Sequence, residues 1–180
     1  MHPPADCRSY ICSMTFNPAS PLSQLLDAPV RSGRVVWIGL RPARRAPIQA
    51  VAEASLSAGR GVEGDRYQRL GGARQVTLIE KENLQAVASY LGREFPVAPE
   101  LVRRNLVIEG INLLALKGRR FSIGMAVLET SGECHPCSRI EEALGVGGYN
   151  AMRGHGGITA RVIAGGEIKV GDPLVSLQTT

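Results

Sequence analysis

Aromatic residues are scarce in this sequence: Phe, Trp and Tyr together make up only 4% of the chain. Proteins that bind single-stranded nucleic acid stack bases on clustered aromatic side chains. The arginines are also scattered and form no single basic tract, which a nucleic-acid interface normally provides. We therefore expect no nucleic-acid partner.

Long apolar runs and a secretory signal are lacking as well. No apolar stretch approaches the ~18 residues of a membrane-spanning helix, and the N-terminus has no basic segment followed by an apolar one. The cysteines are too few for a disulfide scaffold in a chain of 180 residues. They are Cys7, Cys12, Cys134 and Cys137. The expectation is a cytoplasmic protein with free thiols and no membrane contact.

Lysine contributes little of the positive charge. The formal net charge is +5, yet the only lysines are Lys81, Lys117 and Lys169. Arginine presents a planar fork of donors that matches phosphate and carboxylate oxygens. The arginine excess therefore indicates either an anionic partner or a GC-rich genome, and composition alone leaves both open.

The regular alternation of strands and helices that marks a doubly wound sheet is also missing. Short apolar segments at close spacing instead predict a mostly β protein, with a closed or partly open antiparallel β-barrel and a few peripheral helices. Predicted strands cover residues 34–40, 48–54, 74–79, 104–110, 119–124, 125–130, 158–163, 167–170 and 174–177. Predicted helices cover residues 80–91, 99–103 and 138–144.

Prolines interrupt the N-terminal segment, so residues 1–31 are expected to form a flexible lead-in with at most a short helix over Pro21–Asp27. Residues 32–180 are then expected to form the barrel as one domain. The sequence shows no internal repeat and no second domain.

The most reactive stretch of the sequence is Cys134-His135-Pro136-Cys137-Ser138-Arg139, at the junction of a predicted strand and a predicted helix. One interpretation is a dithiol redox pair, but that chemistry normally occurs in a βαβ unit, which this chain lacks. Zinc is a second interpretation, although no second C-x-x-C or paired histidine completes the site. A third is a single thiolate, Cys137, that binds a soft or high-valent metal or carries sulfur. A buried cysteine that merely fills space is the fourth, and the polar surroundings argue against it.

A glycine-rich segment, Gly59 to Tyr67, ends in the charged pair Asp65-Arg66. Three glycines in six positions permit positive φ and close backbone approach. The segment is either a surface turn with a local ion pair or an anion-binding loop that positions Arg66. The pattern alone does not choose between them.

Four motifs in this order resemble the MOSC domain. They are Gly61-Val62-Glu63-Gly64-Asp65-Arg66, Arg104-Asn105-Leu106, the cysteine stretch, and Arg153-Gly154-His155-Gly156-Gly157. MOSC domains form the C-terminal part of molybdenum cofactor sulfurases, the catalytic domain of the mitochondrial amidoxime-reducing component, and small bacterial stand-alone proteins. The resemblance runs from about Gly33 to Leu177, and the chain is most similar to the stand-alone type.

The resemblance implies a barrel that binds molybdenum cofactor (molybdopterin), with Cys137 as the catalytic residue and the protein ligand of the metal. Arg66, Arg104 and Arg139 would bind the anionic part of the cofactor, and Asn105 and Ser138 would hydrogen-bond the pterin. Arg153 and His155 would close the pocket or contact the substrate. Cys134 would be an auxiliary thiol.

Two functions follow from the resemblance. The first is an oxidoreductase that reduces small N-hydroxylated substrates of the hydroxylamino or amidoxime type, with electrons from a separate donor protein, because no flavin, haem or iron–sulfur motif is seen. The alternative is a sulfur carrier or cofactor-delivery protein that bears a persulfide on Cys137, formed with a cysteine desulfurase. The pyridoxal-phosphate domain of full sulfurases and the N-terminal barrel domain of the amidoxime-reducing type have no counterpart here.

Overall fold

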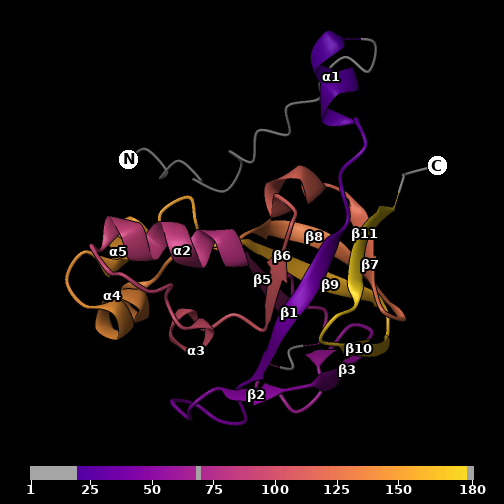
Figure 1. Cartoon of the computed structure of the whole chain (residues 1–180). Coiled ribbons are helices and arrows are strands. Elements are labelled where there is room, and N and C mark those ends of the chain that lie inside the picture. The colour runs from indigo at the N-terminus through magenta and orange to yellow at the C-terminus, as the bar shows by residue number, and fades with distance from the viewer. Residues whose placement is uncertain (1–19, 68–69, 178–180) are drawn as a thin grey trace, which may run out of the picture.

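Seven strands close into a β-barrel, which the computed structural model describes together with its helices over residues 20–67 and 70–177 (Figure 1). The barrel strands are β1 (Gly33–Leu40), β5 (Val76–Glu80), β6 (Leu106–Glu109), β7 (Arg120–Ile123), β8 (Ala126–Glu133), β9 (Ile158–Ala164) and β11 (Pro173–Leu177). Their order is β11-β7-β8-β9-β5-β6-β1, and the ring closes because Gly33 of β1 pairs with Leu174 of β11. The predicted mostly β barrel with a few helices is confirmed.

One strand pair in the barrel runs parallel. Strands β5 and β6 pair in this way, with Leu78 opposite Leu106. A parallel pair needs a long crossover connection, and here helices α2 (Lys81–Tyr90) and α3 (Pro99–Val102) provide it. All other pairs in the barrel are antiparallel, as the sequence predicts.

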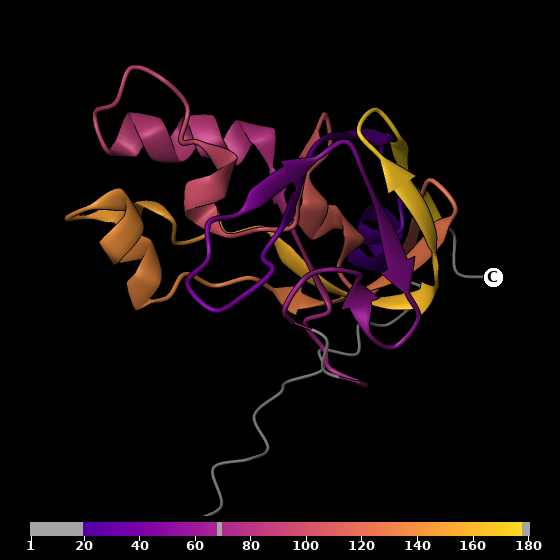
Figure 2. The same ribbon diagram turned by 90° about the horizontal axis from the view of Figure 1, so that it is seen from below.

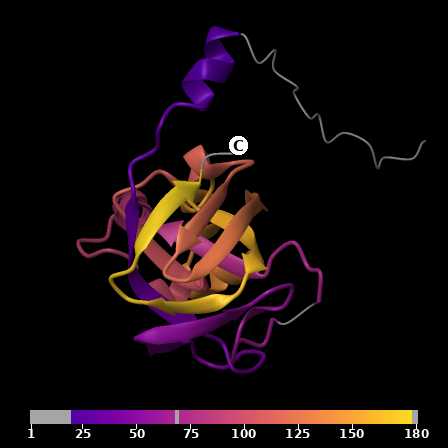
Figure 3. The ribbon, with the colours of Figure 1, turned by 90° about the vertical axis from the view of Figure 1, so that its right-hand side faces the viewer.

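A second, three-stranded sheet lies against one end of the barrel (Figure 3). It contains β3 (Glu53–Ser57), β4 (Gly61–Val62) and β10 (Gly166–Lys169), while β2 (Gln49–Val51) extends the barrel sheet beside β1. The sequence predicts one strand over residues 48–54. The structure divides it at Ala52, because β2 pairs with β1 and β3 pairs with β10 and β4.

Two apolar cores support the molecule. The first fills the barrel, with side chains such as Phe121, Leu78 and Leu128 that are fully buried. The second joins the barrel wall to helices α2, α4 (Ser138–Leu144) and α5 (Gly148–Ala151), which lie together beside the barrel (Figures 1 and 2). Ile140 and Leu144 lie one turn apart on α4 and are buried in this second core, so α4 is held firmly at the position that follows the two cysteines.

The helix predicted over Pro21–Asp27 is present as α1 (Pro21–Leu26), with the Ser20 side chain accepting a hydrogen bond from the Ser23 backbone N–H as its N-cap. It projects from the barrel (Figures 1 and 3). A short 3₁₀ turn spans Leu113–Leu116. Cys7 and Cys12 lie outside the described residues. Among the described helices, none has both the length and the apolar character needed to cross a bilayer.

Candidate active site

The two cysteines of the C-x-x-C stretch have opposite environments. Cys134 is 2% exposed and directly follows β8, whereas Cys137 is exposed and is the N-cap residue of α4. Both are free thiols. Strand β8 continues past the predicted end at Thr130, because Gly132 and Glu133 pair with Thr159 and Ile158 of β9. Of these two thiols, Cys137 is the one that a ligand in solution can reach, because Cys134 is buried.

Arg104 holds this turn from inside the protein. Its buried guanidinium donates from Nη2 to the Cys134 carbonyl at 3.1 Å and from Nε to the Gly156 carbonyl at 2.8 Å. Nη1 donates to the Val102 carbonyl at 2.8 Å. Burial lowers the pKa of Arg104, and the nearby Cys134 opposes that shift. Arg104 thus fixes the backbone before Cys137, and its predicted contact with an anion stays a prediction.

Gly156 and Gly157 let the chain approach Cys134 closely. A Cβ on Gly156 would lie 1.9 Å from the Cys134 carbonyl oxygen. The Cys134 backbone N–H donates to the Gly157 carbonyl at 2.8 Å. The glycines of the predicted fourth motif therefore act through their backbone, by clamping the cysteine turn against the end of the barrel.

Gly156→Ala is expected to destabilise the protein by about 1–3 kcal/mol, because overpacking a tight contact costs that much and the Arg104 bond to Cys134 would have to lengthen. Gly154→Ala is the matched control. Its site is open, with no atom within 4 Å of the added Cβ, so only the positive φ of +77° is strained. Urea unfolding of both variants measures the difference; equal costs would show that the close approach to Cys134 is unimportant.

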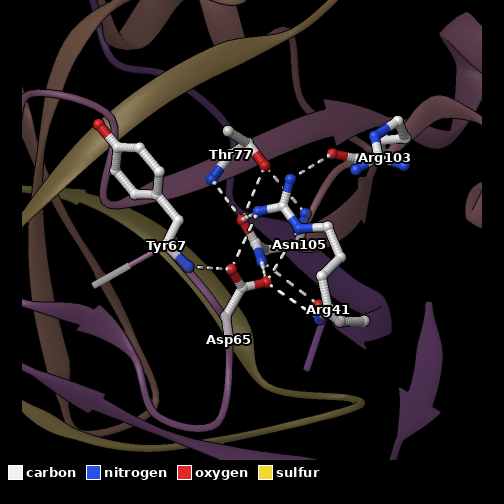
Figure 4. A network of polar contacts seen from close by, with 7 residues as sticks. Arg41, Asp65, Tyr67, Thr77, Arg103 and Asn105 are labelled. Carbon is white, nitrogen blue, oxygen red and sulfur yellow. Dashed lines mark hydrogen bonds and ion pairs between the residues drawn. The ribbon is translucent and has the colours of Figure 1, made fainter. Parts of the chain in front are cut away.

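Asp65 is the centre of a second buried network (Figure 4). Its Oδ2 accepts hydrogen bonds from Arg41 Nε at 3.0 Å, from the Arg41 backbone N–H at 3.1 Å and from Asn105 Nδ2 at 2.9 Å. Its Oδ1 accepts from the Tyr67 backbone N–H at 2.9 Å and from Arg41 Nη2 at 3.3 Å. The carboxylate is 2% exposed and pairs with Arg41, so the alternative of a surface turn with a local ion pair to Arg66 is wrong.

Asn105 joins this network to two barrel strands, β1 and β5. Its Oδ1 accepts hydrogen bonds from Thr77 Oγ1 at 2.8 Å, the Thr77 backbone N–H at 3.2 Å and Arg41 Nη2 at 3.3 Å, while its Nδ2 also donates to the Gly39 carbonyl. The side chain is 1% exposed. Every polar atom of Asn105 is thus engaged within the protein, and a direct bond to a pterin would have to displace one of these partners. In this geometry the Asn105 side chain holds Arg41 and Asp65 in place against the barrel strands.

Four arginines and Cys137 gather above these networks. Arg103 is half-buried, and burial lowers its pKa; the positive charges of Arg41, Arg139 and Arg66 lower the pKa further, while Cys137 raises it. Arg66 is exposed, and its backbone N–H donates to the Arg41 carbonyl at 2.7 Å. Repulsion among these guanidinium groups is relieved by an anion, so the surroundings of Cys137 are suited to a phosphate or a thiolate.

The predicted site residues lie in three places. Arg66 and Arg139 share the electrostatic surroundings of Cys137 through Arg103, and Ser138 is exposed as the first residue of α4. Arg104 and Asn105 support them from beneath. His155 points elsewhere: its Nδ1 lies 2.8 Å from Asn83 Oδ1 on α2, and its ring lies 5.2 Å from that of Tyr90. Arg153, just after α5, is exposed on the same helical side.

Arg41 and Arg103 are site residues that the sequence reasoning missed. Arg41 follows β1 directly, and its Nη1 donates to the Arg103 carbonyl at 3.3 Å. Arg103 adopts a left-handed conformation, with φ 58°, which ends α3 and turns the chain into β6. Two features of the sequence could have indicated Arg41: the basic turn that follows the first predicted strand, and the need of the Asp65 carboxylate for a cationic partner.

Within residues 20–67 and 70–177, no three His, Cys, Asp or Glu side chains gather as a set of metal ligands. Cys137 thus stands as a single thiol donor among arginines. A metal with several further coordination positions would need most of its ligands from another molecule.

Over residues 20–67 and 70–177, the structure is a β-barrel with the exposed Cys137 thiol close to several arginines. The model of one family, the MOSC domain, matches residues 65–175, which is more than half of the chain. The chain belongs to the MOSC domain family, which is associated with molybdenum-cofactor-related proteins.

Solved structures share this fold. YuaD from Bacillus subtilis superposes with a TM-score of 0.73 at 19% identity, over 84% of this chain and 98% of that one. YiiM from Escherichia coli gives a TM-score of 0.63 at 22% identity, over 82% and 71% of the two chains. YiiM from Geobacillus stearothermophilus gives 0.66 at 19% identity, over 81% and 75%. The comparison with curated proteins found no match.

Proposed function

We propose that this protein is a molybdenum-cofactor-dependent oxidoreductase that reduces small N-hydroxylated substrates, with Cys137 as the protein ligand of the metal. The observation that carries the proposal is the exposed Cys137 thiol beside Arg139, in the field of Arg41, Arg66 and Arg103. Membership of the MOSC family supports the choice of cofactor.

The residues at the site fit this cofactor by their chemistry. A pterin dithiolene supplies two sulfur ligands and a phosphate, so the protein needs to add only one soft donor and several cationic groups. Cys137 is that donor. Arg66, Arg103 and Arg139 would hold the phosphate or other anionic groups, and Ser138 Oγ would donate or accept a hydrogen bond at the start of α4. Arg104 and Asp65 keep both sides of the site in place.

The bound cofactor would supply a two-electron redox couple next to Cys137. In the overall reaction the N–O bond of the substrate breaks, and two electrons come from a separate donor protein. Two protons are taken up from solution: one completes water with the departing hydroxyl group, and the other ends on the nitrogen of the product. The chain's own part is to keep the thiolate oriented through the Arg104 clamp. The arginine N–H groups would also donate hydrogen bonds to the oxygen of the N-hydroxyl group.

Activity tests this proposal. Cofactor-loaded protein should reduce benzamidoxime to benzamidine with reduced methyl viologen as electron donor. Cys137→Ser should lower kcat/KM by more than about 100-fold, because even partners outside the ligand shell of a metal often cost 10–100-fold. Cys134→Ser is the matched control and should keep most of the activity, since Cys134 is buried and, within the described residues, its Sγ accepts a single hydrogen bond, from Arg74 Nη2 at 3.5 Å. Equal activity in Cys137→Ser would refute the assigned role.

A sulfur-carrier function is the second candidate, favoured by the exposure of Cys137 and by its free thiol. The Cys137 thiolate would accept sulfane sulfur from the persulfide of a cysteine desulfurase, which is left as a thiol. Mass spectrometry after incubation with a desulfurase and cysteine would detect an adduct of roughly 32 Da, one sulfur atom, on Cys137. A protein that gains no such adduct, yet reduces benzamidoxime, would exclude this alternative.

A further inference from the structure

A cavity of about 630 Å³ lies on the helical side of the molecule, away from the proposed cofactor site. It is lined by Tyr90, Leu91, Val146, Gly147, Asn150, Ala151, Arg153 and His155. Its volume falls within the range of small-molecule pockets, roughly 300–1,000 Å³. No function discussed above uses it, although the sequence resemblance singles out two of its residues, Arg153 and His155.

The cavity and Cys137 lie at opposite ends of α4. Cys137 precedes the first residue of this helix, whereas Val146 and Gly147 follow its last residue, Leu144. Seven helical residues rise about 10 Å along the helix axis. None of the arginines around Cys137 lines the cavity. A molecule in the cavity would therefore occupy a separate site.

The polar lining of the cavity has one sign of charge. Arg153 contributes an exposed guanidinium that forms no side-chain hydrogen bond or ion pair with the described part of the chain, and no carboxylate is among the lining residues. Glu141, which contacts this segment, already accepts hydrogen bonds from the Gly147 and Tyr149 backbone N–H groups, at 2.8 and 2.6 Å. Arg93 covers the end of α4 by donating to the Leu144 carbonyl at 2.5 Å. The free guanidinium of Arg153 therefore favours an anionic group.

Much of the remaining wall is aromatic or apolar. The rings of Tyr90 and His155 lie 5.2 Å apart at an angle of 53°. Val146 is 98% exposed and Tyr90 is 62% exposed, so each offers apolar area that the chain itself does not cover. An apolar wall and one cationic side chain, Arg153, together suit an amphipathic ligand that has an apolar body and an anionic group.

The His155 ring is held in a defined orientation. The buried Glu80 carboxylate accepts from Asn83 Nδ2 at 2.8 Å and from the Leu113 backbone N–H at 3.0 Å. Since Asn83 Nδ2 is thus a donor, its Oδ1 must be the atom that faces His155, and His155 Nδ1 carries the hydrogen. Glu80 and Asn83 therefore position this wall of the cavity before any ligand arrives, which lowers the cost of binding.

We propose that this cavity is a binding site for an aromatic carboxylate. Arg153 would bind the carboxylate through its planar fork, Asn150 would add a hydrogen bond, and the aromatic body would contact Tyr90, His155 and Val146. The site is independent of molybdenum cofactor and of the function proposed for Cys137.

Isothermal titration calorimetry of the full chain with 2-naphthoate tests the proposal. We expect saturable binding of 2-naphthoate and much weaker binding of acetate, which lacks the rings, and of 2-naphthamide, which lacks the charge. Arg153→Gln should weaken 2-naphthoate binding by about tenfold or more, because it removes a charge-assisted bidentate contact. Tyr90→Leu should weaken it as well, by removing one wall.

Arg161→Gln is the matched control, since Arg161 is an exposed arginine on β9 and does not line the cavity. It should bind 2-naphthoate as the unaltered protein does. Thermal unfolding of Arg153→Gln shows whether the variant is folded. No binding to the unaltered protein, or equal binding by Arg153→Gln and Arg161→Gln, would overturn the proposal. Neither result bears on the molybdenum content of the protein.

Discussion

Replacing Asp65 with alanine is expected to lower the free energy of unfolding by about 3–5 kcal/mol, the cost of removing one partner from a buried ion pair. The Asp65 carboxylate accepts five hydrogen bonds, and three of them come from Arg41. Without it, Arg41 and Asn105 Nδ2 lose their acceptor in a region that water reaches poorly. Urea or guanidinium unfolding, read by tryptophan fluorescence from Trp37, measures the change.

Two further variants make this result specific. Asp65→Asn keeps the size of the side chain but places an amide donor among donors, so it should also be strongly destabilised. Glu109→Gln is the control for an ordinary ion pair. Glu109 pairs with Lys81 at 2.8 Å on the surface, and such pairs contribute roughly 1 kcal/mol or less. If Asp65→Ala cost no more than Glu109→Gln, the Asp65 network would not hold the fold together.

Arg104→Met is the second change with a large expected effect. Methionine fills similar space but leaves the carbonyls of Val102, Cys134 and Gly156 without their donor. Each buried polar group without a partner costs roughly 1–3 kcal/mol, so a loss of about 3 kcal/mol or more is expected. Arg104→Lys keeps the charge but not the fork, and should be intermediate.

The consequence for the cysteine turn can be read separately from stability. In the unaltered protein iodoacetamide should alkylate the exposed Cys137 and leave the buried Cys134 unmodified. Arg104→Met should open the turn, so that Cys134 is alkylated as well, under conditions where the variant is still folded. Fragment-ion mass spectrometry assigns the two sites. Arg66→Met, which removes an exposed arginine, should leave Cys134 protected; continued protection in Arg104→Met would contradict the clamp.

Much of the fold could be predicted because its signals are local. Short apolar segments bounded by glycine and proline indicate strands, and the spacing of Leu84, Val87 and Ala88 indicates the buried face of α2. What failed depended on pairing between distant segments. The division at Ala52, the extension of β8 to Glu133 and the parallel β5–β6 pair are decided by which strands lie side by side.

The same distinction applies to the site. The position of Cys137 at the start of a helix could be predicted from neighbouring residues, and in the structure Cys137 is the N-cap of α4. The partner of Asp65 could not be predicted in this way, because Arg41 lies 24 positions earlier in the chain. The sequence resemblance implies that Asn105 hydrogen-bonds the pterin, and only the fold shows that its amide is engaged by strands β1 and β5. For His155, the neighbour that decides its orientation, Asn83, is 72 positions away.

The most direct test is the molybdenum and pterin content of protein purified from cells that make the cofactor. Inductively coupled plasma mass spectrometry measures the metal, and fluorescence of the oxidised pterin measures the organic part. Molybdenum and pterin should be present in equal, stoichiometric amounts in the unaltered protein, and molybdenum should be lost in Cys137→Ser but kept in Cys134→Ser. Unaltered protein that contains neither molybdenum nor pterin would contradict the proposal that Cys137 is a ligand of this cofactor.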